Sequence, residues 1–210
     1  VSYQSGSQMD VALTPTLTPS VTLAGTVKSS TTGSPIAQAK VWVAGDVVVL
    51  TDGSGSYTIP NLPTGRTFNL YASYSGYRER RINDLPTGSL AGVTISQNIA
   101  LTPDTVDVGS VQGRVVDAIS GSDLGGVRVE LADGLVYHTP YYGTYYIDNV
   151  PVGKTYTLVA RAYSGYRPRS ISGISAGQKV GFSPPDSPSS VTDIDLALSP
   201  EQYELGAISG

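Results

Sequence analysis

Residues 173–177 (GISAG) fit the GxSxG pattern, which in some hydrolases presents a serine nucleophile, here Ser175. Such a serine works only on a sharp turn from a strand into a helix, with a base within reach. The chain has a single histidine, His138, and its composition favours no helix. We therefore interpret the match as coincidental. We predict that the chain has no catalytic residues and is not an enzyme.

Residues 52–55 (DGSG) could form part of a calcium loop, in which alternating oxygens and a glycine bend the chain around the ion. The single carboxylate of Asp52 is too few for such a site. A hairpin turn, in which Asp and Gly supply local hydrogen bonds and positive φ, is the simpler interpretation. The chain also lacks cysteine, which excludes disulfides and thiolate zinc sites. We predict no metal and no cofactor.

Tyrosine is abundant, with 14 residues that gather in clusters. Exposed clusters could stack on glycans or pack against a neighbouring subunit. The alternative is that tyrosine is used for its β-propensity and for packing in the core. One pair falls in a predicted loop, where burial is least obligatory. The candidate glycan or interface aromatics are Tyr141, Tyr142, Tyr74 and Tyr163.

A small group of arginines, Arg78, Arg80 and Arg81, follows the sequence SGY, and Arg167 and Arg169 match it in part. We interpret this group as a solvated strand face. Charge complementarity with the acidic residues near the C-terminus would also suit a head-to-tail polymer. The formal net charge of −4 and the pI of about 4.8 argue against nucleic acid as a partner.

The composition predicts a folded β protein. Gly (24 residues) and Pro (14 residues) are frequent, so long helices are not expected. Apolar residues make up 40% of the chain and charged residues only 14%, which is not the signature of disorder. The longest apolar strings are far shorter than a membrane span. No leader sequence is recognised at Val1, so we expect a mature product or a segment of a longer chain.

The chain repeats internally, and two sets of landmarks agree on the spacing. The sequence ALTP at 12–15 returns at 100–103 and, as ALSP, at 197–200. Glycines that close short apolar stretches stand at positions 25, 113 and 210, which gives the same offsets of about 88 and 97 residues. We therefore predict two tandem repeats, at 21–103 and 104–200. The ends that remain, 1–20 and 201–210, are each predicted to contain an orphan strand.

Alternation of apolar residues predicts short β-strands in each repeat. In the closing strand of the first repeat Ile99 and Leu101 share one face and Ala100 takes the other. Turn signals recur every 8 to 12 residues or so, and about seven strands fit in each repeat. The predicted fold class is all-β, with two tandem Greek-key β-sandwiches and an extra strand at each end of the chain.

Three segments of the first repeat carry a resemblance to a known family: residues 25–43 (GTVKSSTTGSPIAQAKVWV), 51–65 (TDGSGSYTIPNLPTG) and 75–77 (SGY). Together they resemble the carboxypeptidase regulatory-like domain, a transthyretin-like β-sandwich. In the second repeat residues 139–142 (TPYY) replace the DGSG turn. The resemblance implies a non-catalytic accessory or structural module, often found in tandem in bacterial and archaeal secreted and surface proteins, and it names no ligand.

An isolated apolar strand needs a sheet to pair with. If the 210 residues are a whole subunit, the N-terminal strand should be donated to a neighbouring copy, and the head-to-tail contact would build a filament. The predicted function is therefore a non-catalytic structural subunit of a surface filament or pilus, extracellular and at the cell surface. Its partners would be copies of itself. The predicted strand-exchange residues are Met9, Val11, Leu13, Leu205 and Ile208.

Two alternatives remain open at this point. The chain could be a segment of a longer tandem-repeat stalk or adhesin, in which the orphan strands belong to adjacent repeats. It could also be a carbohydrate-binding or accessory module that uses its tyrosine-rich loops. Residues 14–20 and 183–190 are rich in hydroxyl residues and proline, which suggests O-glycosylation.

Overall fold

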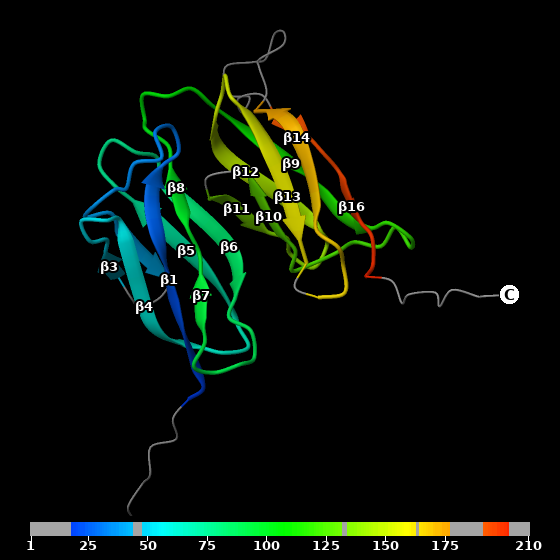
Figure 1. The fold of residues 1–210 in the computed structure, drawn as a ribbon, viewed down its shortest axis with the longest axis horizontal. Helices are drawn as coiled ribbons and strands as arrows, with labels where there is room; N and C mark the ends of the chain where they lie inside the picture. The colour runs from blue at the N-terminus through cyan, green and yellow to red at the C-terminus, as the bar shows by residue number, and fades with distance from the viewer. Residues whose placement is uncertain (1–17, 44–47, 132–133, 163, 177–190, 202–210) are drawn as a thin grey trace, which may run out of the picture.

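The structure is a computed structural model that describes residues 18–43, 48–131, 134–162, 164–176 and 191–201. Within these residues all regular secondary structure is β, with sixteen strands and no helix (Figure 1). The strands form four sheets of four strands, two sheets in each half of the chain. The predicted all-β fold of two tandem sandwiches is confirmed. The predicted end strands lie outside the described residues.

In the first sandwich, one sheet is built on the long opening strand, which pairs antiparallel with β4 and parallel with β7 and β8. The other sheet has the order β3-β2-β5-β6 and is antiparallel. The strands are β1 (Ser20–Ser29), β2 (Lys40–Val43), β3 (Val48–Leu50), β4 (Ser56–Pro63), β5 (Thr67–Ser73), β6 (Arg80–Pro86), β7 (Thr94–Ser96) and β8 (Ile99–Leu101).

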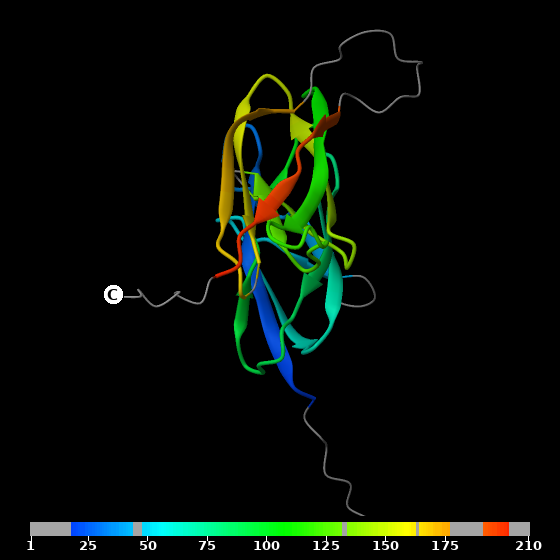
Figure 2. The ribbon, with the colours of Figure 1, turned by 90° about the vertical axis from the view of Figure 1, so that its right-hand side faces the viewer.

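The second sandwich repeats this arrangement strand for strand. Its opening strand pairs antiparallel with β12 and parallel with β15 and β16, as Figure 2 shows for β16, and the other sheet has the order β11-β10-β13-β14. The strands are β9 (Val108–Asp117), β10 (Arg128–Leu131), β11 (Leu135–His138), β12 (Thr144–Pro151), β13 (Thr155–Arg161), β14 (Arg169–Ser175), β15 (Val191–Asp193) and β16 (Leu196–Leu198).

The glycine landmarks have a steric cause. A Cβ on Gly25 would lie 1.9 Å from the backbone oxygen of Gln97, and a Cβ on Gly113 would lie 1.9 Å from that of Ile194. The same two oxygens accept hydrogen bonds of 2.6 Å from the hydroxyls of Tyr57 and Tyr145. Each sandwich is therefore closed by one tyrosine hydroxyl and one position where only glycine fits.

The closing strand β8 alternates as predicted, with a result that the sequence did not reveal. Ile99 and Leu101 are buried in the core of the first sandwich. Ala100, on the other face, is also fully buried, and it belongs to the core of the second sandwich. The two sandwiches therefore share apolar packing. The segment of chain between their strands is short, at residues 102–107.

Candidate functional site

The junction between the sandwiches is the region where residues of both repeats come closest, and it brings β11 against β6 and β8. Side chains on the outer face of β11 are almost completely buried there: Val136 and His138 are each 1% exposed. The neighbouring residues Leu135 and Tyr137 pack against the core of the second sandwich. Both faces of this edge strand are thus covered, one by its own sandwich and one at the junction.

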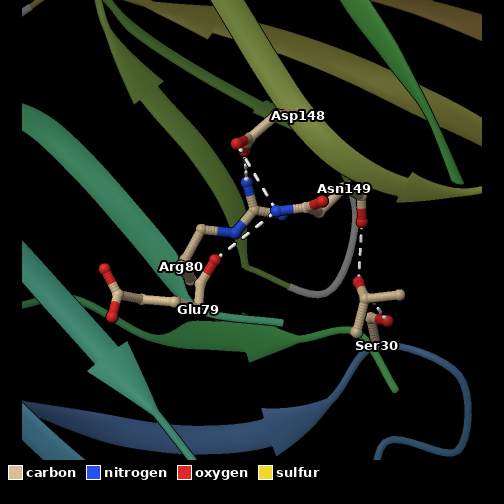
Figure 3. A network of polar contacts seen from close by, with 6 residues as sticks. Ser30, Glu79, Arg80, Asp148 and Asn149 are labelled. Carbon is tan, nitrogen blue, oxygen red and sulfur yellow. Dashed lines mark hydrogen bonds and ion pairs between the residues drawn. The ribbon is translucent and has the colours of Figure 1, made fainter. Parts of the chain in front are cut away.

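A charged pair lies at the centre of the junction (Figure 3). Nη1 of Arg80, on β6, is 2.7 Å from Oδ1 of Asp148, on β12. Arg80 is 2% exposed, whereas the Asp148 side chain is 47% exposed. Burial lowers the pKa of Arg80 and the Asp148 carboxylate opposes that shift. The prediction of a solvated arginine face is therefore wrong for Arg80, which is buried against the second sandwich.

The residue after Asp148 contacts the first sandwich through both its backbone carbonyl and its side-chain amide. Asn149 has a φ of 51° and lies in a β-bulge of β12, where the register with β9 shifts. Its carbonyl accepts a 2.7 Å hydrogen bond from the hydroxyl of Thr102, and its amide Nδ2 donates to the carbonyl of Glu79 at 3.4 Å. The Thr102 hydroxyl also lies 2.9 Å from that of Ser30. The bulge thus inserts into polar groups of the first sandwich.

A second cation reaches across the junction from the turn after β12. Nζ of Lys154 donates to the backbone oxygen of Thr31 at 2.9 Å and to that of Ser30 at 3.5 Å. Nη2 of Arg78 is 3.5 Å from the oxygen of Val106 in the connection between the sandwiches. Together with the shared core, these bonds make the two repeats one packed body.

Two of the predicted aromatic residues do lie together at the surface. Tyr141 is 95% exposed and Tyr142 is 62% exposed. Both line an open cleft of about 810 Å³ at the junction, which Asp84, from the first sandwich, and Asp123 also line. Tyr74 is 40% exposed, and its ring is 6.0 Å from that of Tyr77 instead of lining this cleft. Tyr163 lies outside the described residues.

The predicted strand-exchange residues cannot be placed. Met9, Val11, Leu13, Leu205 and Ile208 all lie outside the described residues.

The structure also places the DGSG segment and the serine of the GxSxG match. Oδ1 of Asp52 accepts hydrogen bonds from the backbone of Ser54 and Ser56 and from the Ser54 hydroxyl, and these bonds, that of the hydroxyl first, lower the pKa of Asp52. This is the turn predicted from the sequence. Ser175 ends strand β14, at the opposite edge of the sheet from His138 on β11.

Neither a metal cluster nor a membrane-spanning helix is found in the part of the chain that the structure describes. No group of three or more acidic, histidine or cysteine side chains among these residues could hold a metal ion. No helix long and apolar enough to cross a membrane occurs among them either.

Comparison with known families places a match on the first sandwich. The family model of the carboxypeptidase regulatory-like domain matches residues 22–102. This range runs from β1 to just beyond β8, so the resemblance seen in the sequence holds for the first repeat. Comparison with curated proteins found no significant match.

Several solved structures match the chain at low sequence identity. The Bacillus anthracis TIE protein is 15% identical with a TM-score of 0.32, and the match covers 87% of this chain and 34% of that one. A streptococcal ancillary pilin is 14% identical with a TM-score of 0.30, covering 90% and 64%. The minor pilin of Streptococcus agalactiae is 12% identical with a TM-score of 0.32, covering 88% and 98%. Likeness this distant identifies no function.

Proposed function

We propose that the chain is a non-catalytic structural subunit of an extracellular surface filament or pilus, which assembles head to tail by β-strand donation. The observation that carries this proposal is the junction. Two sandwiches with a shared core and a buried Arg80 form one stiff body, whereas modules that act separately are usually joined by exposed, flexible linkers. A stiff two-domain body is suited to a structural element.

The N-terminal segment supplies the proposed link between subunits. Met9, Val11 and Leu13 alternate with Asp10 and Ala12, which is the pattern of a strand with one apolar face. Such a strand gains both main-chain hydrogen bonds and apolar burial when it adds to the sheet of a neighbouring subunit. Because each donor meets a different surface on its neighbour, the contact repeats without closing.

Removing the donor segment tests this proposal. A chain that lacks residues 1–15 should remain folded, as shown by its circular dichroism, and should sediment as a monomer under conditions in which the full chain forms fibres. The paired change Val11→Asp with Leu13→Asp should act in the same way, because it places charge on the donated face. The matched change Asp10→Asn with Ala12→Ser alters the other face and should leave fibres intact. Fibres of undiminished length from the truncated chain would exclude strand donation.

The mass of the native polypeptide under denaturing conditions separates a polymer from a longer array. A single subunit of these 210 residues has a mass of 21.9 kDa. A native mass near this value, apart from any O-glycan, supports assembly from separate subunits. A much larger value supports the tandem stalk or adhesin.

A second candidate function, glycan binding, is favoured by one observation. Tyr141 and Tyr142 present exposed rings at a cleft that also contains the carboxylates of Asp84 and Asp123. Exposed aromatic faces beside hydrogen-bonding groups suit a sugar ring. Affinity electrophoresis in glycan-containing gels should show retardation that is lost in Tyr141→Ala and Tyr142→Ala and kept in Tyr74→Ala. Equal migration of all four proteins would exclude this function for the cleft.

A further inference from the structure

The junction is formed by two complementary surfaces, one on each sandwich, which we call its two halves. Each sandwich also has a surface equivalent to the half that lies on the other sandwich. The half on the first sandwich consists of β6, β8 and the groups around Thr102; the half on the second consists of β11 and the bulge at Asn149. Because the sandwiches repeat strand for strand, the first also has a counterpart of the second half, and the second a counterpart of the first. Within the described residues no second sandwich packs on these counterparts, and we call them the unused halves: β3 with the bulge of β4 on the first sandwich, and β14 with β16 on the second.

The unused half on the first sandwich is an exposed apolar edge. β3 pairs with β2 in the same register as β11 pairs with β10, so Val48 and Leu50 correspond to Val136 and His138. The two residues on β3 are 55% and 57% exposed, whereas their counterparts are each 1% exposed at the junction. An edge strand with two large exposed apolar side chains is ready to pack against another surface.

The bulge in β4 of the first sandwich has the same backbone conformation as the bulge in β12 at the junction. Asn61 in β4 corresponds to Asn149 in β12, and both strands shift register at this point. Asn61 has a φ of 62°, against 51° for Asn149. A left-handed conformation is uncommon in residues other than glycine. In the second sandwich the carbonyl of this residue accepts a bond from the first, whereas Asn61 is exposed.

The unused half on the second sandwich contains an open cavity of about 370 Å³. Arg169, Ala197 and Ser199, which correspond to Arg80, Ala100 and Thr102, line it; the complete lining is Arg167, Pro168, Arg169, Ala197, Ser199 and Pro200. The correspondence is fixed by shared bonds, since the backbone nitrogens of Arg78 and Arg167 donate to the oxygens of Thr102 and Ser199. In the first sandwich the counterparts of these lining residues receive the Asn149 bulge.

These two surfaces lie at opposite ends of the molecule. In Figure 1, whose longest axis is horizontal, β3 lies at the left end, and β14 and β16 lie toward the right end. We infer that the Asn61 bulge of a second copy of this chain seats in the cavity beside Ala197 and Ser199, with β3 against β14. The contact repeats the junction between molecules. This inference rests on the proposed filament and names the surfaces by which its subunits meet.

The chemistry of the contact follows from the junction, with one difference. The Ser199 hydroxyl donates to the carbonyl of Asn61, as Thr102 does to Asn149, and Arg66 takes the place of Lys154. Pro60 stands where the junction has Asp148, so Arg169 meets no carboxylate from that position. On β3, Val48 and Leu50 occupy the positions of Val136 and His138, so leucine replaces histidine in the contact. The contact between copies is therefore less polar than the junction inside each copy.

Cross-linking tests the contact directly, because the chain has no cysteine of its own. Pro60→Cys with Pro168→Cys places one thiol on each proposed surface. A short bis-maleimide should then join copies into a ladder of covalent oligomers. The matched pair at the junction, Asp148→Cys with Glu79→Cys, should cross-link within one chain. Thr58→Cys with Leu90→Cys, at exposed positions outside both surfaces, should give no ladder.

A mixture of the single variants Pro60→Cys and Pro168→Cys shows whether the contact is head to tail. It should give covalent dimers and no larger species, because each copy then has one reactive surface. Ala197→Arg fills the cavity and should lower the yield of the ladder at least tenfold, while thermal unfolding shows that it remains folded. Ala91→Arg, at an exposed loop position, should not lower the yield.

The outcomes separate this contact from strand donation. A ladder that persists without residues 1–15 supports the contact independently of the donor strand. Fibres that form while the Pro60 and Pro168 pair cross-links no better than the Thr58 and Leu90 pair, and that tolerate Ala197→Arg, would overturn the contact and leave the filament. If no association of any kind is detected by sedimentation up to millimolar concentration, both proposals fail.

Discussion

The two sandwiches share a framework and differ mainly in what their outer surfaces meet. Thr51 and Thr139 make matching buried hydrogen bonds, to Ile36 and Ala39 in the first sandwich and to Leu124 and Val127 in the second. The outer surfaces do not match. Arg80 is buried against Asp148, whereas its counterpart Arg169 is exposed, with a 3.3 Å contact to the oxygen of Ala197. The comparison teaches that the repeat preserves the fold, while the neighbour determines whether a given side chain is buried.

The sheets that contain β2 and β10 show the same contrast on their outer faces. In the first sandwich Trp42 stacks on Tyr71 with ring centroids 5.3 Å apart, and Lys40 and Arg81 lie 5.1 and 5.6 Å from these rings. In the second sandwich the counterparts of Lys40 and Trp42 are Arg128 and Glu130, which form an ion pair at 3.1 Å. Both sets are cross-strand or same-strand neighbours, so each face is stabilised locally by a different kind of contact.

The largest expected effect tests the shared framework. Gly25→Ala and Gly113→Ala should each lower the free energy of unfolding by about 3 kcal/mol or more, because the added Cβ meets a backbone oxygen that cannot move aside. Urea unfolding at pH 7 measures the loss. Gly53→Ala is the control, since no atom lies within 4 Å of its Cβ. A mild effect at only one of the two landmarks would show that the sandwiches are closed differently.

The next effect tests the contrast between the arginines. Asp148→Ala leaves the buried guanidinium of Arg80 without its carboxylate and should lower the free energy of unfolding by about 2 to 3 kcal/mol. This loss is smaller than for a fully buried pair because Asp148 is half exposed. Arg169→Ala should change the stability by less than about 0.5 kcal/mol. Urea unfolding of both variants makes the comparison. Equal losses would mean that burial at the junction does not matter.

The third prediction concerns pH and the single histidine. Burial, followed by the charge of Arg128, lowers the pKa of His138 from 6.5 to about 4. The imidazole of His138 therefore becomes protonated at higher pH in the unfolded chain than in the folded chain. Protonation of this imidazole favours unfolding. The free energy of unfolding should not depend on this histidine above about pH 7.5, and it should fall by about 2 kcal/mol between pH 8 and pH 5. Urea unfolding across this range measures it.

A matched variant assigns that loss to His138. His138→Leu introduces the residue found at the corresponding position of β3, Leu50, and should flatten the dependence in this window. Hydrogen bonds, first from the backbone of Ser120, hold the pKa of Asp117 below its usual value, so this carboxyl stays ionised above pH 5. An imidazole that titrates near pH 6.5 in the NMR spectrum of the folded protein would contradict the prediction.

The smallest expected effect concerns the Thr102 hydroxyl, which donates to the Asn149 bulge. Thr102→Val removes the hydroxyl that donates to the carbonyl of Asn149 and that contacts the hydroxyl of Ser30. It should lower the free energy of unfolding, measured by urea unfolding, by about 1 kcal/mol. Ser199→Ala, at the corresponding exposed position, should be neutral in the monomer. If both substitutions are neutral, the bulge does not depend on this bond.

Much of the fold could be predicted from the sequence because it depends on local patterns. Ile99 and Leu101 alternate with Ala100, and the glycine landmarks mark close approaches within each repeat. These features require only neighbours along a strand or contacts within one sandwich. The turn at Asp52 was predictable for the same reason, since its partners are two and four residues away.

The junction could not be predicted because its contacts depend on how two sandwiches pack. Arg80 and Asp148 are 68 residues apart, and nothing in the arginine-rich segment marks one member as buried. The burial of Ala100 on its second face likewise requires the neighbouring core. One signal was present: Asn61 and Asn149 occupy equivalent positions in the two repeats, although this asparagine carries no chemistry within a single sandwich.

The parallel pairing of the first and last strands has a mechanical consequence for each sandwich. Val27 pairs with Ile99 and Ser29 with Leu101 in parallel, and β9 pairs with β15 and β16 in the same sense. Tension applied between Ser20 and Leu101 would pull β1 and β8 in opposite directions along their lengths. The hydrogen bonds between them would then share the load in shear and would have to break together. Each sandwich is therefore built to resist stretching along its own chain.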